Sequence, residues 1–205
     1  MAPSIYYYRM TTDNGGAPCV DNGLWSLAIC KPVIRKVANE GDLIVGFAGN
    51  AFGCDNAVVH IARVTTSIPD GGYYQNSQFH SRPDCIYRCE EKVWTIVPND
   101  FHSESDMDRD LGVNRDHAHV LLSEDFRYFG NQPFPVDWQK FPNLRKALDA
   151  LGVGHRVNHL EGVRKELEEV VKGAFNSRSL DDVGAPTHAQ NCPCNRGDEE
   201  SIGVC

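Results

Sequence analysis

Cys30, Lys31 and Arg35 stand together where an apolar run ends and Pro32 lets a helix begin. A thiol at the start of a helix and beside basic side chains loses its proton more readily, which favours the nucleophilic thiolate. Cysteine is also among the residues most often buried, so Cys30 has the alternative role of a small core residue at the end of a strand. Residue type and position make Cys30 a candidate catalytic nucleophile.

Lys31 and Arg35 are four residues apart, so on a helix they share one face. With the unbonded N–H groups of the first helical turn, two such cations can bind a phosphate. Surface ion pairs use the same residue types, which leaves a solvated basic edge as the alternative. We treat both as candidate ligand-binding residues.

Three aspartates are candidates for polar contacts to a ligand. Asp13 lies in a loop, residues 11–23, that is dense in Asp, Asn, Gly and Pro. Its carboxylate is a candidate catalytic group, or an acceptor for the amino edge of a base, and its alternative role is to cap a turn. Asp42 and Asp84 are further candidate ligand-binding carboxylates, although Asp42 can equally tie a turn to the strand that follows.

His102 lies in a polar loop and is a candidate general acid or base, because an unperturbed imidazole titrates near neutral pH. His119 begins a strand and is a candidate ligand-binding residue. Tyr87 and Tyr128 are candidates to stack on a base. Structural roles in the core or at the surface are the alternative for all four.

These side chains must be positioned by short strands and a few helices. Apolar alternation and β-branched or aromatic residues predict strands at 5–10, 24–30, 43–47, 58–64, 119–122 and 127–129, and a hairpin at 85–97. Pro32 and Gly41 predict a helix over 32–40, and helical spacing predicts two more over 144–151 and 160–171. The order of these elements predicts an α+β fold, a small mixed β-barrel with an inserted helix and C-terminal helices.

Composition sets limits on function. The 205 residues are 41% hydrophobic and 23% charged, which is ordinary for a soluble globular protein. The net charge of −8 argues against a protein that coats duplex DNA. No apolar run is long enough to span a bilayer and the N-terminus lacks the layout of a secretory signal, so we expect no membrane partner and an intracellular location, cytoplasmic or nuclear.

Eight cysteines suggest free thiols or a metal site more than disulfides, because the chain is large and lacks a signal sequence. Two sets of residues could supply metal ligands: Cys85 and Cys89 with His80 and His102, and His188 with Cys192, Cys194 and Cys205. Neither set has the paired two-residue spacing that is typical of a zinc site. We predict no metal site. No dinucleotide or phosphate-loop motif is present, so the sequence identifies no cofactor.

Seven motifs occur in one order: D-x-G-x-A-P at 13–18, C-K-P-x-I-R at 30–35, G-D-x-I-V-G at 41–46, D-x-I-Y at 84–87, F-H-S at 101–103, G-V-N-R at 112–115 and V-L-x-S-x-x-F-x-Y-F-G at 120–130. Together they resemble the second of the nucleotide modification associated domains, over about residues 5 to 155. The glycine-aspartate-strand element also resembles PUA-like barrels, which include binders of modified bases. Residues 116–118 and the tail depart from the family pattern.

The resemblance implies association with nucleotide or DNA base modification. We expect three parts: a nucleotide modification associated, barrel-like domain at 1–157, a C-terminal helix packed on it at 158–175, and a flexible cysteine-containing tail at 176–205. The favoured function is recognition of a nucleotide or modified base in a polar pocket, with single-stranded or flipped-base DNA as an extended partner. One alternative is an enzyme that modifies or hydrolyses a nucleotide with Cys30 or Asp13 and His102, and a second is a metal- or redox-responsive interaction protein.

Overall fold

The computed structural model describes residues 2–54, 56–152 and 154–188. Its strands are β1 (Ile5–Met10), β2 (Cys19–Asp21), β3 (Leu24–Leu27), β4 (Leu43–Ala48), β5 (Val58–Arg63), β6 (Thr66–Ile68), β7 (Tyr87–Glu90), β8 (Val93–Ile96), β9 (Val120–Ser123), β10 (Asp125–Tyr128) and β11 (His155–Arg156). Its helices are α1 (Pro32–Val37), α2 (Gly72–Gln75), α3 (Met107–Leu111), α4 (Pro142–Asp149) and α5 (Glu161–Ser177), with short 3-10 turns η1 (Asn50–Phe52), η2 (Ser77–Phe79) and η3 (Glu104–Asp106).

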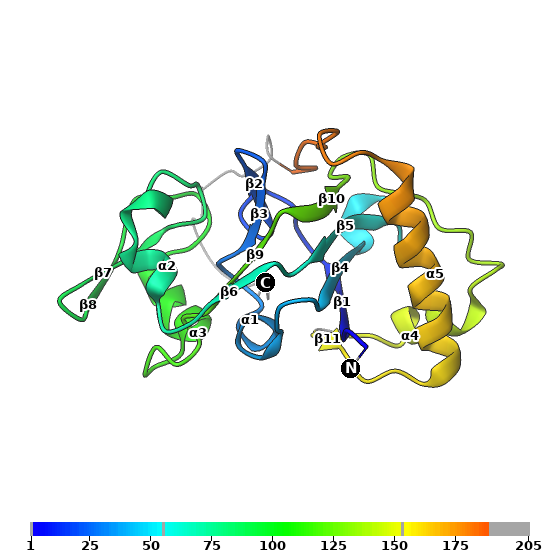
Figure 1. Ribbon diagram of the computed structural model, residues 1–205, viewed down its shortest axis with the longest axis horizontal. Helices are drawn as coiled ribbons and strands as arrows, with labels where there is room; N and C mark the ends of the chain where they lie inside the picture. The colour runs from blue at the N-terminus through cyan, green and yellow to red at the C-terminus, as the bar shows by residue number, and fades with distance from the viewer. Residues whose placement is uncertain (1, 55, 153, 189–205) are drawn as a thin grey trace, which may run out of the picture.

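The strands form two main sheets and a hairpin (Figure 1). The larger sheet has the order β10-β5-β4-β1-β11, and within it β1 and β4 are parallel while the other neighbours are antiparallel. The second sheet has the order β2-β3-β9-β6, and β7 pairs with β8 alone. Helices α4 and α5 lie at the opposite end of the molecule from the β7–β8 hairpin (Figure 1).

The period of two along β1 sends its side chains to two different cores. Ile5 and Tyr7 pack with α4 and α5, whereas Tyr6, Tyr8 and Met10 face the interior between the two sheets. A third core lies under the β7–β8 hairpin and includes residues of α2 and α3. The candidate site lies where the second and third cores meet, because Cys30 belongs to the third core and Tyr8 to the second.

The predicted α+β class is confirmed, but the PUA-like barrel is not. The two main sheets within the described residues are open, and β10 and β11 form the edges of the larger one. A closed barrel would join those edges by a continuous ladder. The sequence reasoning also missed β2 and β6, which have three residues each, and the short helices α2 and α3.

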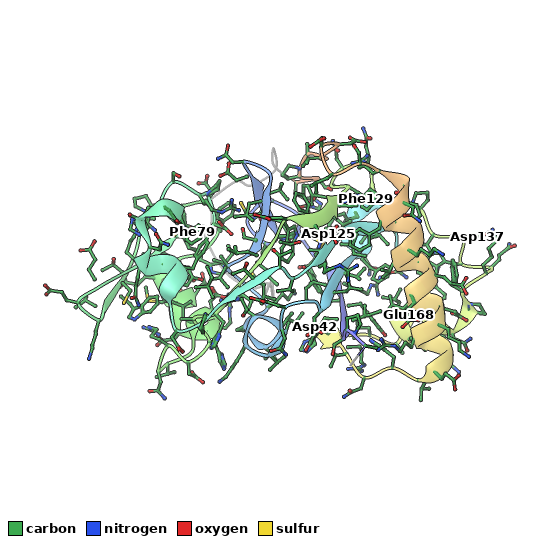
Figure 2. The ribbon with its side chains drawn as sticks, viewed as in Figure 1. Asp42, Phe79, Asp125, Phe129, Asp137 and Glu168 are labelled. Carbon is green, nitrogen blue, oxygen red and sulfur yellow. The ribbon has the colours of Figure 1, made fainter. Side chains whose placement is uncertain are left out.

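Helix α1 is shorter than predicted. It ends at Val37, because the backbone of Ala38 is extended. The turn that follows is held by a hydrogen bond from the Asn39 backbone N–H to Asp42 Oδ2, over 2.9 Å. Gly41 takes the left-handed conformation, with φ of 91°, after the helix has already ended. Asp42 lies beside α1 at the start of β4 (Figure 2).

Residues after α5 return to the sheet. The Gly184 N–H donates to the Tyr128 carbonyl over 2.7 Å, and the Asn131 N–H donates to the Ala185 carbonyl over 2.8 Å. Figure 1 shows this orange segment above β10. The remainder of the tail predicted over 176–205, from residue 189 onward, lies outside the described residues. None of the helices described in this chain is both long enough and apolar enough to cross a bilayer.

Candidate functional site

Cys30 and His102 are brought together from positions 72 residues apart in sequence, with 3.4 Å between Sγ and Nε2. Cys30 lies on the turn from β3 to α1, where both it and Lys31 are left-handed, with φ of 57° and 48°. Left-handed backbone strains residues other than glycine, and such strain concentrates at functional sites. A nucleophile on a strained strand-to-helix turn has its side chain pushed out from the backbone, as in the nucleophile elbow of hydrolases. Cys30 is 8% exposed.

His102 is fixed from two sides. The Asn99 side-chain oxygen accepts the His102 backbone N–H over 2.8 Å, which holds the loop before η3. The Tyr87 hydroxyl lies 2.8 Å from His102 Nδ1. Burial, and then the charge of Asp110, raise the pKa of Tyr87, so its hydroxyl stays protonated at neutral pH. Nδ1 therefore has a fixed partner, and Nε2 is the ring nitrogen that faces Cys30.

Asp110 is a site residue that the sequence reasoning missed. Its Oδ2 lies 3.9 Å from His102 Nδ1 and has no hydrogen-bond partner among the described residues. Its Oδ1 accepts from Arg35 over 2.8 Å, and both side chains are buried. The carboxylate thus faces the ring nitrogen opposite the one that faces Cys30. In the sequence, Asp110 could have been noticed only as one of several acidic residues that follow His102.

Arg35 does not share an open face with Lys31. Its five N–H donors all go to the protein: Nε to the carbonyl of Cys30 (2.7 Å), Nη1 to those of His117 (3.2 Å) and His119 (2.7 Å), and Nη2 to the carbonyl (2.7 Å) and carboxylate (2.8 Å) of Asp110. The side chain is 0% exposed. The guanidinium has no donor left for a phosphate, so the expected ligand role is replaced by a structural one.

Lys31 lies on the other side of the turn. Its Nζ is 4.8 Å from the centre of the Tyr8 ring, a cation–π contact, and the residue is partly exposed. The phosphate site predicted from two basic side chains on one helix face is therefore not formed. Helix α1 has only six residues, so its dipole adds little there.

Tyr8 and His60 were missed by the sequence reasoning. The Tyr8 hydroxyl lies 2.8 Å from His60 Nε2, and both residues pair with Gly46 across adjacent strands. A Cβ on Gly46 would come within 2.3 Å of His60 Nε2, so this position requires glycine. Burial, and then the charge of Lys31, lower the pKa of His60 to about 3, so the ring is neutral. Each residue could have been noticed as a polar side chain within a largely apolar predicted strand, Tyr8 in the strand at 5–10 and His60 in the strand at 58–64.

Asp13 is covered by the protein. Its Oδ1 accepts from the Tyr128 hydroxyl, and its Oδ2 accepts from the backbone N–H (3.0 Å) and hydroxyl (3.2 Å) of Thr187. The residue is 1% exposed. Burial raises the pKa of Tyr128 first, and the charge of Asp13 adds to the effect. The Tyr128 hydroxyl thus binds a carboxylate, and because the residue is 2% exposed its ring is not available as a stacking platform.

The other candidates have structural partners. Asp42 accepts the Ser4 backbone N–H over 2.8 Å in addition to that of Asn39, so it ties the turn to β4. Asp84 accepts from the Ser26 hydroxyl (2.5 Å) and the Tyr73 hydroxyl (2.8 Å), beside Arg82 at 3.5 Å. Burial raises the pKa of Asp84 against the opposing effect of Arg82. His119 gives its carbonyl to Arg35.

No cluster of three or more potential metal ligands occurs in the described part of the chain. Burial raises the pKa of Cys85 to about 11, and its Sγ accepts from Arg88 Nη1 over 3.3 Å. In the second set of potential ligands, His188 Nδ1 accepts the Asp13 backbone N–H over 3.0 Å, while Cys192, Cys194 and Cys205 lie outside the described residues.

An open hollow of about 380 Å³ lies elsewhere, and it is lined by residues of β3, β6, β9, α2 and η2 and by neighbouring loop residues. None of the site residues predicted from the sequence lines it. Cys30, His102 and Asp110 instead meet in one buried cluster. Thiol, imidazole and buried carboxylate in that order can move a proton and form a covalent bond, so we place the candidate site there.

A family model described as nucleotide modification associated domain 2 matches residues 2–192. The match extends beyond the seven motifs to include α5 and the segment that covers Asp13. Neither the search of curated proteins nor the search of solved structures found a match.

Proposed function

Because this chain belongs to the family described as nucleotide modification associated domain 2, we propose that it is an enzyme that acts on a nucleotide or nucleic-acid base. Cys30 is its nucleophile and His102 is its proton carrier. The observation that carries the proposal is the 3.4 Å contact between Cys30 Sγ and His102 Nε2. The family supports a function associated with nucleotide modification, and the reaction is our own inference.

The first step is addition of the thiol to the ligand. In the required tautomer, His102 Nδ1–H donates to the Tyr87 oxygen, and Nε2 takes the proton from Cys30. The sulfur forms a bond to an electron-poor ring carbon, the π electrons of its C=N bond move to the nitrogen, and that nitrogen takes the proton from His102. Atoms and charge balance without a further reactant, and the adduct is activated for substitution.

The surrounding groups act on this pair without touching the ligand. Arg35 binds the Cys30 carbonyl and so fixes the strained turn that presents the sulfur. Tyr87 sets the orientation of the imidazole, and Asp110 stabilises its positive charge once the proton has moved. All three are positioning residues.

Catalysis is a better match to this geometry than recognition alone. The recognition hypothesis needs Arg35 and Tyr128 to present polar or aromatic groups to a ligand, and the protein occupies both. The Cys30–His102 contact instead sets a thiol against an imidazole, a pair that recognition does not use and that covalent catalysis does. A free nucleotide or an unpaired base suits the net charge of −8 better than a DNA duplex.

The test measures two quantities in the full-length chain: the alkylation rate of the Cys30 thiol and the formation of a covalent adduct between Cys30 and a base. We expect iodoacetamide to alkylate Cys30 rapidly at neutral pH, monitored on its own peptide by mass spectrometry, and His102→Asn to slow that rate about tenfold or more. His80→Asn is the matched control, since the His80 ring lies 3.1 Å from the Tyr74 carbonyl oxygen and has no contact with Cys30 among the hydrogen bonds of the described residues. Acid quenching with a panel of nucleotides should trap a base adduct on Cys30. Equal alkylation rates in the two variants together with no adduct would refute the enzyme.

A further inference from the structure

Residues 184–188 form a strap over the loop that carries Asp13. In the strap, the Gly184 N–H donates to the Tyr128 carbonyl, and the Ala185 carbonyl accepts from the Asn131 N–H. His188 makes two bonds with Asp13, since the His188 N–H donates to the Asp13 carbonyl over 2.8 Å and the Asp13 N–H donates to His188 Nδ1 over 3.0 Å. The strap therefore joins the Asp13 loop to the end of β10.

Two glycines make this approach possible. A Cβ on Gly130 would lie 2.0 Å from the Ala185 carbonyl oxygen, and a Cβ on Gly184 would lie 2.1 Å from that of Phe129. Any other residue at either position would force the two backbones apart. Phe129 lies near the upper end of α5 (Figure 2). The close packing of the strap against the end of β10 therefore depends on glycine at positions 130 and 184.

Asp13 under the strap is an unusual carboxylate. It is 1% exposed, and the three hydrogen bonds that the described residues give its side chain all come from neutral donors. Buried carboxylates usually pair with a cation, because neutral hydrogen bonds only partly replace the lost hydration. Thr187 supplies two of the three donors, and both converge on Oδ2. Two neighbouring donors are also what the pairing edge of a guanine base presents to a carboxylate.

We propose that Asp13 reads the donor edge of the bound base and that Thr187 holds this position until the base displaces the strap. The inference rests on the proposed function, since it names the base class for the same site. A chain of side-chain contacts joins the two ends of the site. Tyr128, which binds Asp13, pairs with His60 across neighbouring strands, and the Tyr8 hydroxyl lies 2.8 Å from His60 Nε2. The Tyr8 ring in turn lies under Lys31, the neighbour of Cys30, at 4.8 Å. Guanine presents two adjacent donors, N1–H and the N2 amino group, whereas uracil presents a single N3–H between two carbonyl oxygens that the carboxylate repels.

The experiment measures binding of GMP and UMP to the full-length protein by calorimetry. We expect GMP to bind at least about tenfold more tightly than UMP, the discrimination of one good two-donor contact. Thr187→Val removes the hydroxyl donor from the closed strap, so GMP affinity should rise about 2- to 10-fold. Thr187→Ser keeps the donor and is the matched control. Asp13→Asn should abolish the preference for GMP while a thermal melt confirms that the variant folds.

Two outcomes would overturn the inference: equal affinities for GMP and UMP, or Thr187→Val and Thr187→Ser with the same affinity for GMP. Neither outcome depends on thiol chemistry. Alkylation of Cys30 that still responds to His102→Asn would then preserve the enzyme proposal with a different base. If GMP binds as expected while Cys30 shows no dependence on His102, the strap inference stands and the nucleophile proposal fails.

Discussion

The Nε–H of Arg35 donates to the carbonyl oxygen of Cys30 over 2.7 Å, from a guanidinium that no solvent reaches. The same guanidinium holds the backbone at Asp110, His117 and His119. Helix α1 therefore fixes, through one side chain, both the turn of the candidate nucleophile and helix α3, which carries the buried Asp110 carboxylate. Four predictions follow from this and related contacts.

Arg35→Met should destabilise the protein by about 3–5 kcal/mol, because it leaves the Asp110 carboxylate buried without its cation. The matched control is Lys36→Met on the same helix, where the ion pair with Asp116 is exposed and should contribute about 0–1 kcal/mol. Urea denaturation of the two variants measures both values. Similar losses in the two would show that Arg35 is not the clamp described above.

Tyr87→Phe should slow alkylation of Cys30, by less than His102→Asn does, because the imidazole remains but its Nδ1 loses the oxygen that orients it. We expect about a threefold to tenfold decrease at neutral pH. Tyr73→Phe is the control, since it removes another buried hydroxyl, which donates to Asp84 and accepts from Arg82. An unchanged rate in Tyr87→Phe would mean that the hydroxyl does not position His102.

His60 should make the protein less stable in mild acid. Its native pKa is about 3, whereas the unfolded value is 6.5, so below about pH 6.5 only the unfolded chain takes up this proton. The stability that depends on neutral His60 is complete above pH 6.5 and is lost at up to about 1.4 kcal/mol per pH unit as the pH falls toward 3. Urea denaturation between about pH 7.5 and 5 should show the free-energy difference between wild type and His60→Gln shrinking with acid. Parallel curves would contradict the burial of a neutral ring.

Gly130→Ala should lift the strap. The new Cβ meets the Ala185 carbonyl oxygen at 2.0 Å, and the residue also has φ of 54°. Gly53→Ala isolates the cost of a positive φ, about 1 kcal/mol, because nothing lies within 4 Å of its Cβ position. Hydrogen exchange should show faster opening at residues 184–188 in Gly130→Ala only. Equal exchange in both variants would mean that the close approach does not hold the strap.

The sequence by itself determined most of the local structure. Runs of β-branched and aromatic residues between turn signals located β1, β4, β5 and the β7–β8 hairpin, because such side chains favour the extended backbone. Pro32 marked the first residue of α1, since proline fits only the first turn. Cys30 and His102 could also be singled out, because their chemistry depends on residue type. The sequence could not pair them, since 72 positions separate the two in the chain.

Only the tertiary structure decided which candidates are available to a ligand. The four-residue spacing of Lys31 and Arg35 predicted that the two side chains share one helix face. The left-handed backbone at Cys30 and Lys31 instead directs Arg35 into the interior and Lys31 toward the Tyr8 ring. Asp13 is covered by Thr187 from 174 positions away. Local pattern is set by a few neighbouring dihedral angles, whereas a side chain's partners depend on how distant segments pack. Whether a charged group binds a ligand or the protein is settled by those partners.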